Sequence, residues 1–464
     1  MTQCSLLASG EISARELLEA CVGQYNDHNA ELNAVVVTNL DDARAAASEA
    51  DEAHAAGRTL GPLHGIPMTI KDSIDIVGLP STWGDTDHAN YLPPENADVV
   101  QQLQDAGAII YGKTNVPKHL GDWQTYNGVY GRTNNPWDVS RSAGGSSGGS
   151  AVSVATGMAT FEIGSDIGGS IRWPANYNGI AGLKTSFGLV SPHGHSYPGH
   201  EGIVDNNVLG PIARSVEDLS LILPVLCQPH IRPISTNKTS LADFTVGVLL
   251  DNPLGPQDDT VTAVLSEAIA QLVAAGMTAV DPPDLDFVLS GHRAGLEIGR
   301  AAASGPDAPP TPEALARYDA GERDYAALVA HASRMTYRQW IDLNNERERS
   351  RLRWRDYFAN VDLLLTPVTP TTAPPHDTER SFSDQTVLVN GEQRPVLEQW
   401  FWAGLANPTY LPALTLPAGL AADGLPVGLQ VLGPFMGDLL TLRFGELAEC
   451  VLGHPLDTLF ADYG

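Results

Sequence analysis

The sequence predicts an α/β layered fold, and three observations lead to that prediction. Segments with apolar residues at helical spacing alternate along the chain with short apolar runs that are typical of strands. Two of the predicted helices end at a glycine, Gly57 and Gly107, as helices commonly do. Hydrophobic residues make up 43% of the 464 residues, which provides ample material for a folded core and is unlike a disordered composition.

The first predicted helix begins at a capping box, in which Ser13 and Glu16 satisfy each other's backbone N–H groups. Leu17, Leu18 and Cys21 then follow at helical spacing. Further along, apolar and Ala-rich runs predict strands at 32–37, 66–71 and 108–111 and helices at 41–56 and 97–106.

Residues 131–199 differ in character, because Gly, Ser, Asn and Pro dominate and the apolar runs are short. An α/β pattern resumes after residue 242. It predicts strands at 246–250 and 277–280, helices at 260–275 and 336–358, and a hairpin at 387–391 whose turn is Asn-Gly. Residues 303–312 form a predicted surface loop, and 228–242 is a candidate connector.

The last of these helices carries a run of arginines among acidic residues. The run consists of Arg347, Arg349, Arg351, Arg353 and Arg355. This pattern is typical of a solvated face laced by ion pairs, which we favour over an anion-binding site.

The charge of the chain argues against several classes of partner. Lys+Arg 27 against Asp+Glu 55 gives a net charge of −28, which repels polyphosphate and anionic lipid surfaces, so neither nucleic acid nor a membrane is expected as a partner. The four cysteines are dispersed without a C-x-x-C pair, which argues against a disulfide framework and against a zinc site. No signal-peptide pattern is visible, so a cytoplasmic location is expected.

Three pieces of the sequence are candidates for chemistry: Lys71 at the end of an apolar strand, the Gly/Ser run 144–150, and the run Asp-Ile-Gly-Gly-Ser-Ile-Arg at 166–172. A Gly/Ser run alone is also typical of a flexible linker. A phosphate-binding loop would need Gly-Lys-Ser/Thr after the glycines, and no lysine is present there. Two glycine turns together with a strand lysine favour a catalytic site.

A nucleophile elbow of the α/β-hydrolase type is one interpretation of the first run. Residues 145–149 match G-x-S-x-G with Ser147 at the centre, and that fold then needs a late histidine, for which His376 and His454 are available. The match is weak evidence, because any Gly/Ser-rich run produces it.

A second interpretation uses all three pieces. Serine becomes a nucleophile when a base takes its proton, and a lysine can be that base because burial lowers the pKa of an amine. Lys71 follows an apolar run at 66–70. Glycines let backbone N–H groups crowd together toward a developing oxyanion, and residues 167–170 can present such groups beside Ser170.

Six segments occur in order along the chain: GRTNNPW at 131–137, GGSSGGS at 144–150, GSDIGGSIR at 164–172, GIAGLK at 179–184, GPIARSVED at 210–218 and LPVGLQ at 425–430. With these segments, the sequence closely resembles the amidase signature family, from about Ser13 to the C-terminus. Six such segments in this order are highly specific for that family.

The resemblance implies a Ser–cisSer–Lys triad. Ser170 aligns with the nucleophile, Ser146 with the bridging serine that follows a cis peptide after Gly145, and Lys71 with the general base. It also implies an oxyanion hole built from the backbone N–H groups of Ile167, Gly168, Gly169 and Ser170 and an acyl pocket lined by Leu120, Gly121, Asp122 and Trp123.

The resemblance further implies a single α/β/α domain over residues 1–464, with a mixed central sheet covered by helices on both faces. The signature core would span about 60–220 and a variable substrate-pocket region about 228–410. The implied activity is hydrolysis of the C–N bond of aryl or alkyl amides, with esters and urethanes (carbamates) open to the same acyl-transfer chemistry. A small-molecule amide is the implied partner, no metal or cofactor is required, and a monomer or homodimer is expected.

Several other residues carry two interpretations. Asp166 and Arg172 are expected to tie the nucleophile loop by hydrogen bonds, and Trp400, Trp402 and Tyr410 either line the pocket or pack in the core. His193, His195 and His200 are close in sequence but lack a metalloprotease spacing.

Two alternative functions remain. The glutaminase component of a tRNA-dependent amidotransferase resembles this core, but the aromatic stretch 399–402 lies where an acidic glutamine anchor is expected. A catalytically inactive binding or scaffold protein is disfavoured by the presence of Lys71, Ser146 and Ser170.

Overall fold

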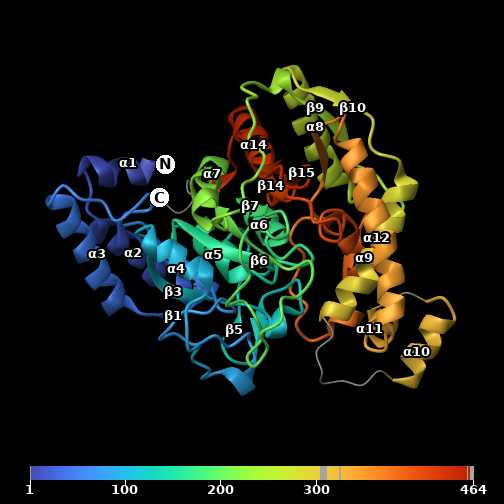
Figure 1. The fold of residues 1–464 in the computed structure, drawn as a ribbon, viewed down its shortest axis with the longest axis horizontal. Helices are drawn as coiled ribbons and strands as arrows, with labels where there is room; N and C mark the ends of the chain where they lie inside the picture. Colours follow the sequence, from blue (N-terminus) through green and yellow to red (C-terminus); the bar gives the residue numbers. More distant parts are fainter. Residues whose placement is uncertain (1, 304–310, 323–324, 457, 460–464) are drawn as a thin grey trace.

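A mixed eight-stranded sheet forms the centre of the protein in a computed structural model, which describes residues 2–303, 311–322, 325–456 and 458–459 (Figure 1). In sheet order its strands are β10 (Thr278–Val280), β9 (Thr245–Val248), β11 (Leu363–Pro367), β15 (Pro426–Leu432), β14 (Ala413–Leu420), β7 (Ala181–Lys184), β8 (Val208–Ala213) and β6 (Phe161–Asp166). The first three strands are parallel to one another, and every pairing from β11 to β6 is antiparallel.

Helices cover both faces of this sheet, so the predicted α/β/α fold is confirmed. On one face α5 (Gly148–Ala155) packs against α6 (Arg172–Asn178). On the other face α14 (Asp438–Leu452) packs against α7 (Val216–Leu226) and α8 (Asp259–Ala274). The buried surfaces of the strands are dominated by Val, Ile, Leu and Ala, as expected for a sheet with helices on both sides.

A smaller sheet places the candidate lysine. Its strands are β1 (Val35–Thr38), β3 (Ile109–Thr114) and β2 (Pro67–Lys71), in that order, and β2 lies beside β6. The Thr160 N–H donates to the Pro67 carbonyl at 3.4 Å, and the Lys71 amine contacts the Ser165 hydroxyl at 2.9 Å. The two strands therefore run in the same direction, and β2 ends where β6 leads into the loop at 167–170.

The remaining helices form two groups on opposite sides of the molecule in Figure 1. The N-terminal group comprises α1 (Thr2–Ser9), α2 (Ala14–Leu32), α3 (Leu40–Ala55) and α4 (Asp98–Asp105), and the opposite group comprises α9 (Leu285–Ala303), α10 (Pro312–Asp319), α11 (Tyr325–Ala332) and α12 (Tyr337–Tyr357). Short elements complete the fold: β4 (Tyr126–Asn127), β5 (Gly131–Arg132), β12 (Thr386–Val389), β13 (Glu392–Pro395) and α13 (Trp400–Ala403). No helix in the described part of the chain is long and apolar enough to cross a membrane.

Most elements predicted outside 131–199 are confirmed to within a few residues. The capping box of α2 forms, with the Ser13 hydroxyl accepting from the Glu16 N–H at 3.1 Å. The predicted hairpin forms between β12 and β13, with Asn390 and Gly391 in its turn. The strand predicted from residue 32 starts only at Val35, because α2 continues to Leu32 and Asn33 closes it in the left-handed conformation. The loop predicted at 303–312 lies largely outside the described residues.

The Gly/Ser-rich stretch 131–199 contains more regular structure than its composition indicates. It forms α5, β6, α6 and β7, and no residue between 142 and 186 is exposed. The glycines are needed there for close packing, since a Cβ at Gly149 would lie 2.4 Å from the Asn115 nitrogen and one at Gly148 would lie 2.3 Å from the Thr125 hydroxyl. Tertiary packing thus outweighs the low helix propensity of glycine in α5.

The expectation of a wholly solvated arginine face on α12 is wrong for one residue. Arg347 is only 3% exposed and forms an ion pair with Asp205, and its guanidinium lies 4.9 Å from the Tyr410 ring centre. The guanidinium of Arg351, which is half-buried, lies 4.5 Å from the centre of the same ring. These two arginines join α12 to the core, which a pattern of alternating charges does not indicate.

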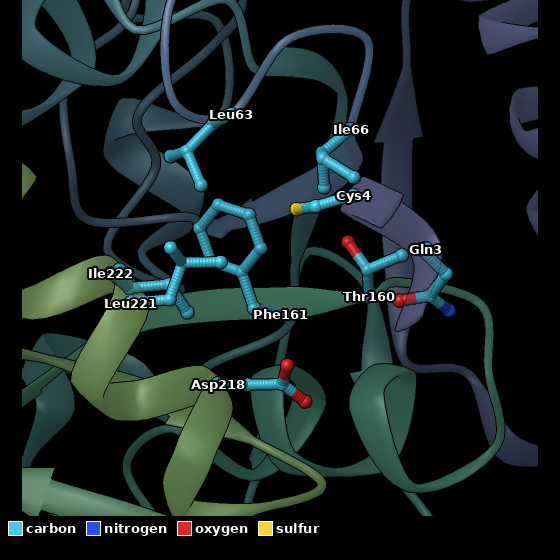
Figure 2. Close-up of a pocket in the computed structure, with 9 residues that line it drawn as sticks. All are labelled: Gln3, Cys4, Leu63, Ile66, Thr160, Phe161, Asp218, Leu221 and Ile222. Atoms are coloured by element: carbon cyan, nitrogen blue, oxygen red, sulfur yellow. The ribbon is translucent and has the colours of Figure 1, made fainter. Parts of the chain in front are cut away.

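One pocket lies at the end of β6 that is far from the 167–170 loop (Figure 2). It is lined by Leu63, Ile66, Phe161, Leu221 and Ile222, together with Gln3, Cys4, Thr160 and Asp218. Each strand residue advances about 3.3 Å, so Phe161 lies on the order of 16 Å along β6 from Asp166. This pocket is therefore separate from the candidate site.

Candidate active site

Lys71 lies at the centre of a buried group of serine hydroxyls. Its side chain is fully buried, and its Nζ atom lies 2.7 Å from the Ser146 Oγ, 2.9 Å from the Ser147 Oγ and 2.9 Å from the Ser165 Oγ. A neutral amine has two N–H donors and one lone pair, so it can donate to two hydroxyls while it accepts from the third. The three contacts match that capacity.

Burial makes the neutral amine accessible at ordinary pH. Desolvation lowers the pKa of Lys71 to about 7, although the nearby carboxyl groups of Asp166, Glu162 and Asp72 act in the opposite direction. Burial also raises the pKa of Glu162 to about 8. The lysine can therefore exchange a proton near neutrality, as a general base must.

Ser146 follows a cis peptide bond from Gly145, as the resemblance implies. Gly145 contacts the backbone of the predicted acyl pocket, since a Cβ there would lie 2.7 Å from the Asp122 carbonyl oxygen and 2.8 Å from the Trp123 carbonyl carbon. Only glycine allows this close approach. The next residue, Ser146, has its hydroxyl in contact with the Lys71 amine.

Ser170 lies in the loop between β6 and α6 and is 5% exposed. The Ser147 N–H donates to the Ser170 carbonyl at 3.2 Å, which joins the two serine segments directly. Within the described residues, the Ser170 hydroxyl makes no hydrogen bond to a side chain or the backbone. The structure thus brings all three residues of the predicted triad into one small region.

The loop amides expected to face an oxyanion differ in what they contact. The Gly169 N–H donates to the Asp166 carboxylate at 2.8 Å, so this one of the four is engaged within the protein. The N–H groups of Ile167, Gly168 and Ser170 donate to no group in the described part of the chain. Gly169 also has a φ of 105°, and a Cβ there would lie 2.7 Å from the Trp173 indole nitrogen.

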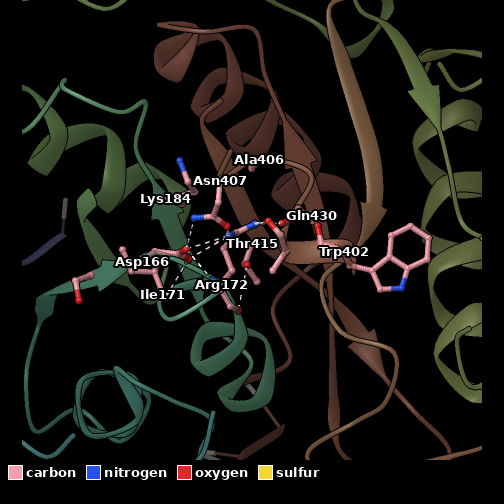
Figure 3. A network of polar contacts seen from close by, with 12 residues as sticks. Asp166, Ile171, Arg172, Lys184, Trp402, Ala406, Asn407, Thr415 and Gln430 are labelled. Carbon is pink, nitrogen blue, oxygen red and sulfur yellow. Dashed lines mark hydrogen bonds and ion pairs between the residues drawn. The ribbon is translucent and has the colours of Figure 1, made fainter. Parts of the chain in front are cut away.

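Asp166 and Arg172 hold the loop as expected, through a buried network (Figure 3). The Arg172 Nη2 donates to the Asp166 carboxylate at 2.9 Å, and its Nη1 donates to the Gln430 side chain at 2.6 Å and to the Ala403 carbonyl at 2.9 Å. Burial alone would raise the pKa of Asp166, but the guanidinium of Arg172 holds it well below its usual range. The network ties the 167–170 loop to β15 and α13.

Breaking this ion pair should cost much of the stability of the protein. In Arg172→Leu the buried Asp166 carboxylate loses its charged partner, and we expect the free energy of unfolding to fall by about 3–5 kcal/mol. Urea denaturation followed by circular dichroism measures the change. The exposed Arg349→Leu on α12 is the matched control, expected within about 0.5 kcal/mol of the parent. Equal midpoints for the two variants would contradict this account of the network.

The four predicted acyl-pocket residues occupy different environments. Leu120 is half-buried and Gly121 is exposed, whereas the Asp122 carboxylate is buried and accepts from the Gln385 amide at 2.9 Å. Burial raises the pKa of Asp122 to about 6. Trp123 points into an aromatic cluster: its ring centre lies 3.9 Å from that of Trp173, and Phe382 and Trp400 complete the cluster at 4.9 and 6.1 Å.

The aromatic cluster borders the 167–170 loop. A Cβ added at Gly168 would lie 3.5 Å from the Trp400 ring, and Trp173 contacts Gly169. Trp400 is therefore positioned to line the site, whereas Trp402 packs in the core beside Phe401. Tyr410 is not part of the aromatic cluster. Its ring stacks on that of Phe187, with 4.4 Å between the ring centres, and contacts the Arg347 guanidinium.

Ser165 and Glu162 were not singled out from the sequence, although both lie on β6 next to the motif. Both are polar residues on a strand that is buried throughout, and such residues usually have a specific partner; this is the signal by which they could have been found. Ser147 contacts Lys71 and Ser165, and not a histidine as a nucleophile elbow requires. His376 contacts the Val139 carbonyl and His454 the Arg214 carbonyl.

The histidines at 193, 195 and 200 diverge in the structure. His193 pairs with Asp98 at the surface, whereas His195 is buried against Ser73 and Asn207. No three potential metal-ligating side chains gather anywhere among the described residues.

Comparisons with known proteins identify the family of the chain. The Amidase family model matches residues 16–442. A Glutamyl-tRNA(Gln) amidotransferase subunit from Chloroflexus aggregans is 32% identical over 487 residues, covering 96% of this chain and 94% of that protein. The indoleacetamide hydrolase of Bradyrhizobium diazoefficiens is 30% identical over 464 residues, covering 93% and 82%.

A solved structure described as that of an amidase superposes with a TM-score of 0.81 at 30% identity, covering 97% of this chain and 99% of that one. The match thus extends over the fold as well as the sequence. This chain belongs to the amidase signature family of enzymes.

Proposed function

We propose that the protein hydrolyses the C–N bond of small-molecule amides with Ser170 as nucleophile, Ser146 as the bridging serine and Lys71 as the base. The 2.7 Å contact between the fully buried Lys71 amine and the Ser146 hydroxyl carries this proposal. A buried amine with a pKa of about 7 can accept a proton near neutrality, and the Ser146 hydroxyl lies close enough to supply one.

In acylation a proton relay runs from Ser170 through Ser146 to Lys71 and then back through Ser146 to the leaving nitrogen. Neutral Lys71 takes the proton of the Ser146 hydroxyl, Ser146 takes that of Ser170, and the Ser170 oxygen bonds to the carbonyl carbon. The carbonyl oxygen becomes an oxyanion, to which we assign the N–H groups of Ile167, Gly168 and Ser170 as donors. Charged Lys71 then returns a proton through Ser146 to the nitrogen, the C–N bond breaks and the amine leaves, with the acyl group bound to Ser170.

Deacylation repeats the cycle with water. A water molecule gives a proton through Ser146 to Lys71 and attacks the ester carbon, and the carboxylic acid is released as the Ser170 oxygen regains a proton. Ester and urethane carbonyls present the same electrophile, so we propose them as further substrates. The aromatic cluster of Trp123, Trp173 and Trp400 favours substrates with an apolar, planar acyl group.

A hydrolysis screen of the purified single chain tests the function. We expect release of para-nitroaniline from anilides of aromatic acids, with esters and urethanes cleaved as well. Loss of all amide, ester and urethane turnover in protein that is folded by circular dichroism would overturn the proposal.

A second candidate is the glutaminase part of an amidotransferase, which the 32% identity to an amidotransferase component supports. Trp400 against Gly168 gives an apolar surface where glutamine needs polar partners, so we favour the first candidate. Ammonia release from glutamine exceeding release from aryl amides by the single chain would favour the second. A non-catalytic scaffold would instead resist labelling of Ser170 by a fluorophosphonate.

The rate should depend on pH through Lys71. Only the neutral amine can accept a proton, and the protonated fraction falls as pH rises through the lysine pKa of about 7. We therefore expect kcat/KM for a neutral anilide to rise about tenfold per pH unit below that pKa and to level off above it. Initial rates from pH 5.5 to 9 measure this, and a rate that is flat across the range would exclude a lysine base with that pKa.

A further inference from the structure

The residues that lead into the predicted acyl pocket have an unusual backbone conformation. His119 and Leu120 have φ values of 54° and 57°, and Trp83 in the neighbouring segment has a φ of 54°. Residues other than glycine rarely adopt this left-handed region, and they stay there only when their surroundings hold them. His119 and Leu120 directly precede the pocket residues 121–123.

Backbone contacts join this turn to the base strand. The His119 N–H donates to the Trp83 carbonyl at 2.7 Å, and the Trp83 N–H donates to the Asp72 carboxylate at 2.7 Å. Asp72 is the residue after Lys71. The turn is therefore linked through two hydrogen bonds to the residue that follows the base.

A buried carboxylate holds the side chain of the same turn. Asp85 is 3% exposed, and its Oδ2 atom contacts the His119 Nε2 at 2.5 Å and accepts from the Tyr197 hydroxyl at 2.8 Å. Burial alone would raise the pKa of Asp85, but the hydrogen bonds from His119 and Tyr197 outweigh it and hold that pKa below its usual range. Asp85 is thus an anion at neutral pH, and Lys118 adds a positive charge 3.4 Å away.

The residues that follow the turn, Asp122 and Trp123, contact the candidate active site. The Asp122 and Trp123 backbone lies against Gly145, the residue before Ser146, and the Trp123 ring lies in the aromatic cluster beside the nucleophile loop. Lys71 and Ser146 are held by separate contacts of their own. Trp123 is only three residues after Leu120, so its place depends directly on the turn, whereas Lys71 and Ser146 have these additional contacts.

We propose that Asp85 is a positioning residue for substrate recognition, which holds His119 in the left-handed turn and thereby sets the place of Trp123. This inference rests on the proposed function and deepens it. Among the described residues, Asp85 contacts none of the three triad side chains. It should therefore govern binding of a bulky acyl group and leave the reactivity of the nucleophile unchanged.

The test compares Asp85→Ala with the parent on the para-nitroanilides of phenylacetic acid and acetic acid, which share one leaving group. We expect KM for the phenylacetyl substrate to rise about tenfold with kcat within about threefold, and KM for the acetyl substrate to change less than about twofold. Labelling by a small methyl fluorophosphonate should keep its rate. Asp87→Ala, an exposed residue in the same segment, is the matched control.

A rescue variant separates positioning from folding. Glycine adopts a positive φ without strain, so Asp85→Ala/His119→Gly should regain part of the lost affinity for the phenylacetyl substrate. Should Asp85→Ala not fold, Asp85→Asn keeps the shape of the side chain, removes its charge and should show the same split. The inference is overturned if both substrates and the labelling rate change together, or if no KM changes. Failure of the parent to cleave any amide would instead count against the proposed function.

Discussion

Ser170→Ala should abolish amide turnover while the protein stays folded. The variant removes the hydroxyl that attacks the carbonyl, and the remaining oxyanion donors cannot replace it. We expect kcat for an aryl anilide to fall by a factor on the order of 10⁴ or more, measured as para-nitroaniline release by the purified protein. The Ser170 hydroxyl makes no hydrogen bond within the described residues, so stability should change little.

The control for this variant is Ser48→Ala, an exposed serine on α3 in the N-terminal group of helices. It should keep the parent rate and the parent labelling by a fluorophosphonate. Turnover by Ser170→Ala close to that of Ser48→Ala would remove Ser170 from the nucleophile role.

Lys71→Met should lower the rate nearly as much. Methionine fills a similar volume without an amine, so Ser146 loses the base that takes its proton, and general-base catalysis contributes about 10²–10⁴-fold. We expect kcat to fall by a factor in this range and the rise of rate with pH through about 7 to disappear. A Ser–His–acid hydrolase would respond differently, because its rate would survive the loss of Lys71.

Lys184→Met is the matched control for burial. Lys184 is also fully buried, and desolvation lowers its pKa to about 7, but its amine donates to the backbone carbonyls of Thr185 and Leu411. Both variants remove a buried amine, so their unfolding midpoints should shift similarly. Activity should fall steeply only in Lys71→Met, and a comparable loss in both would show that folding and not chemistry explains the effect.

Local signals were sufficient for many elements of the fold. The capping box at Ser13 and the Asn390–Gly391 turn involve residues within a few positions of each other, so their structures follow from local sequence. The Gly-rich stretch around 148 is different, because α5 depends on how closely the backbone near Asn115 approaches it. That approach is set by β3, more than thirty positions away along the chain. The helix propensities of the residues in α5 do not depend on such distant contacts, so they cannot predict it.

The site shows the same division. Lys71, Ser146 and Ser170 could be named from the strand lysine, the glycine turns and the resemblance to a family. Ser165 contacts Lys71 because β2 lies beside β6, which the sequence does not show. The Gly169 N–H donates to the Asp166 carboxylate because of the conformation of the folded loop. Arg347 reads as a surface charge in the sequence and is buried against Asp205 in the structure.

The sequence by itself determined which atoms are available for chemistry, namely an amine after an apolar strand and hydroxyls within glycine turns, because residue type alone sets donor, acceptor and nucleophile. Only the tertiary structure decided which hydroxyls face the amine, how far burial shifts its pKa, and what holds Trp123 beside the loop. Those properties depend on distances and desolvation between segments remote in the chain, and such quantities exist only once the strands have packed.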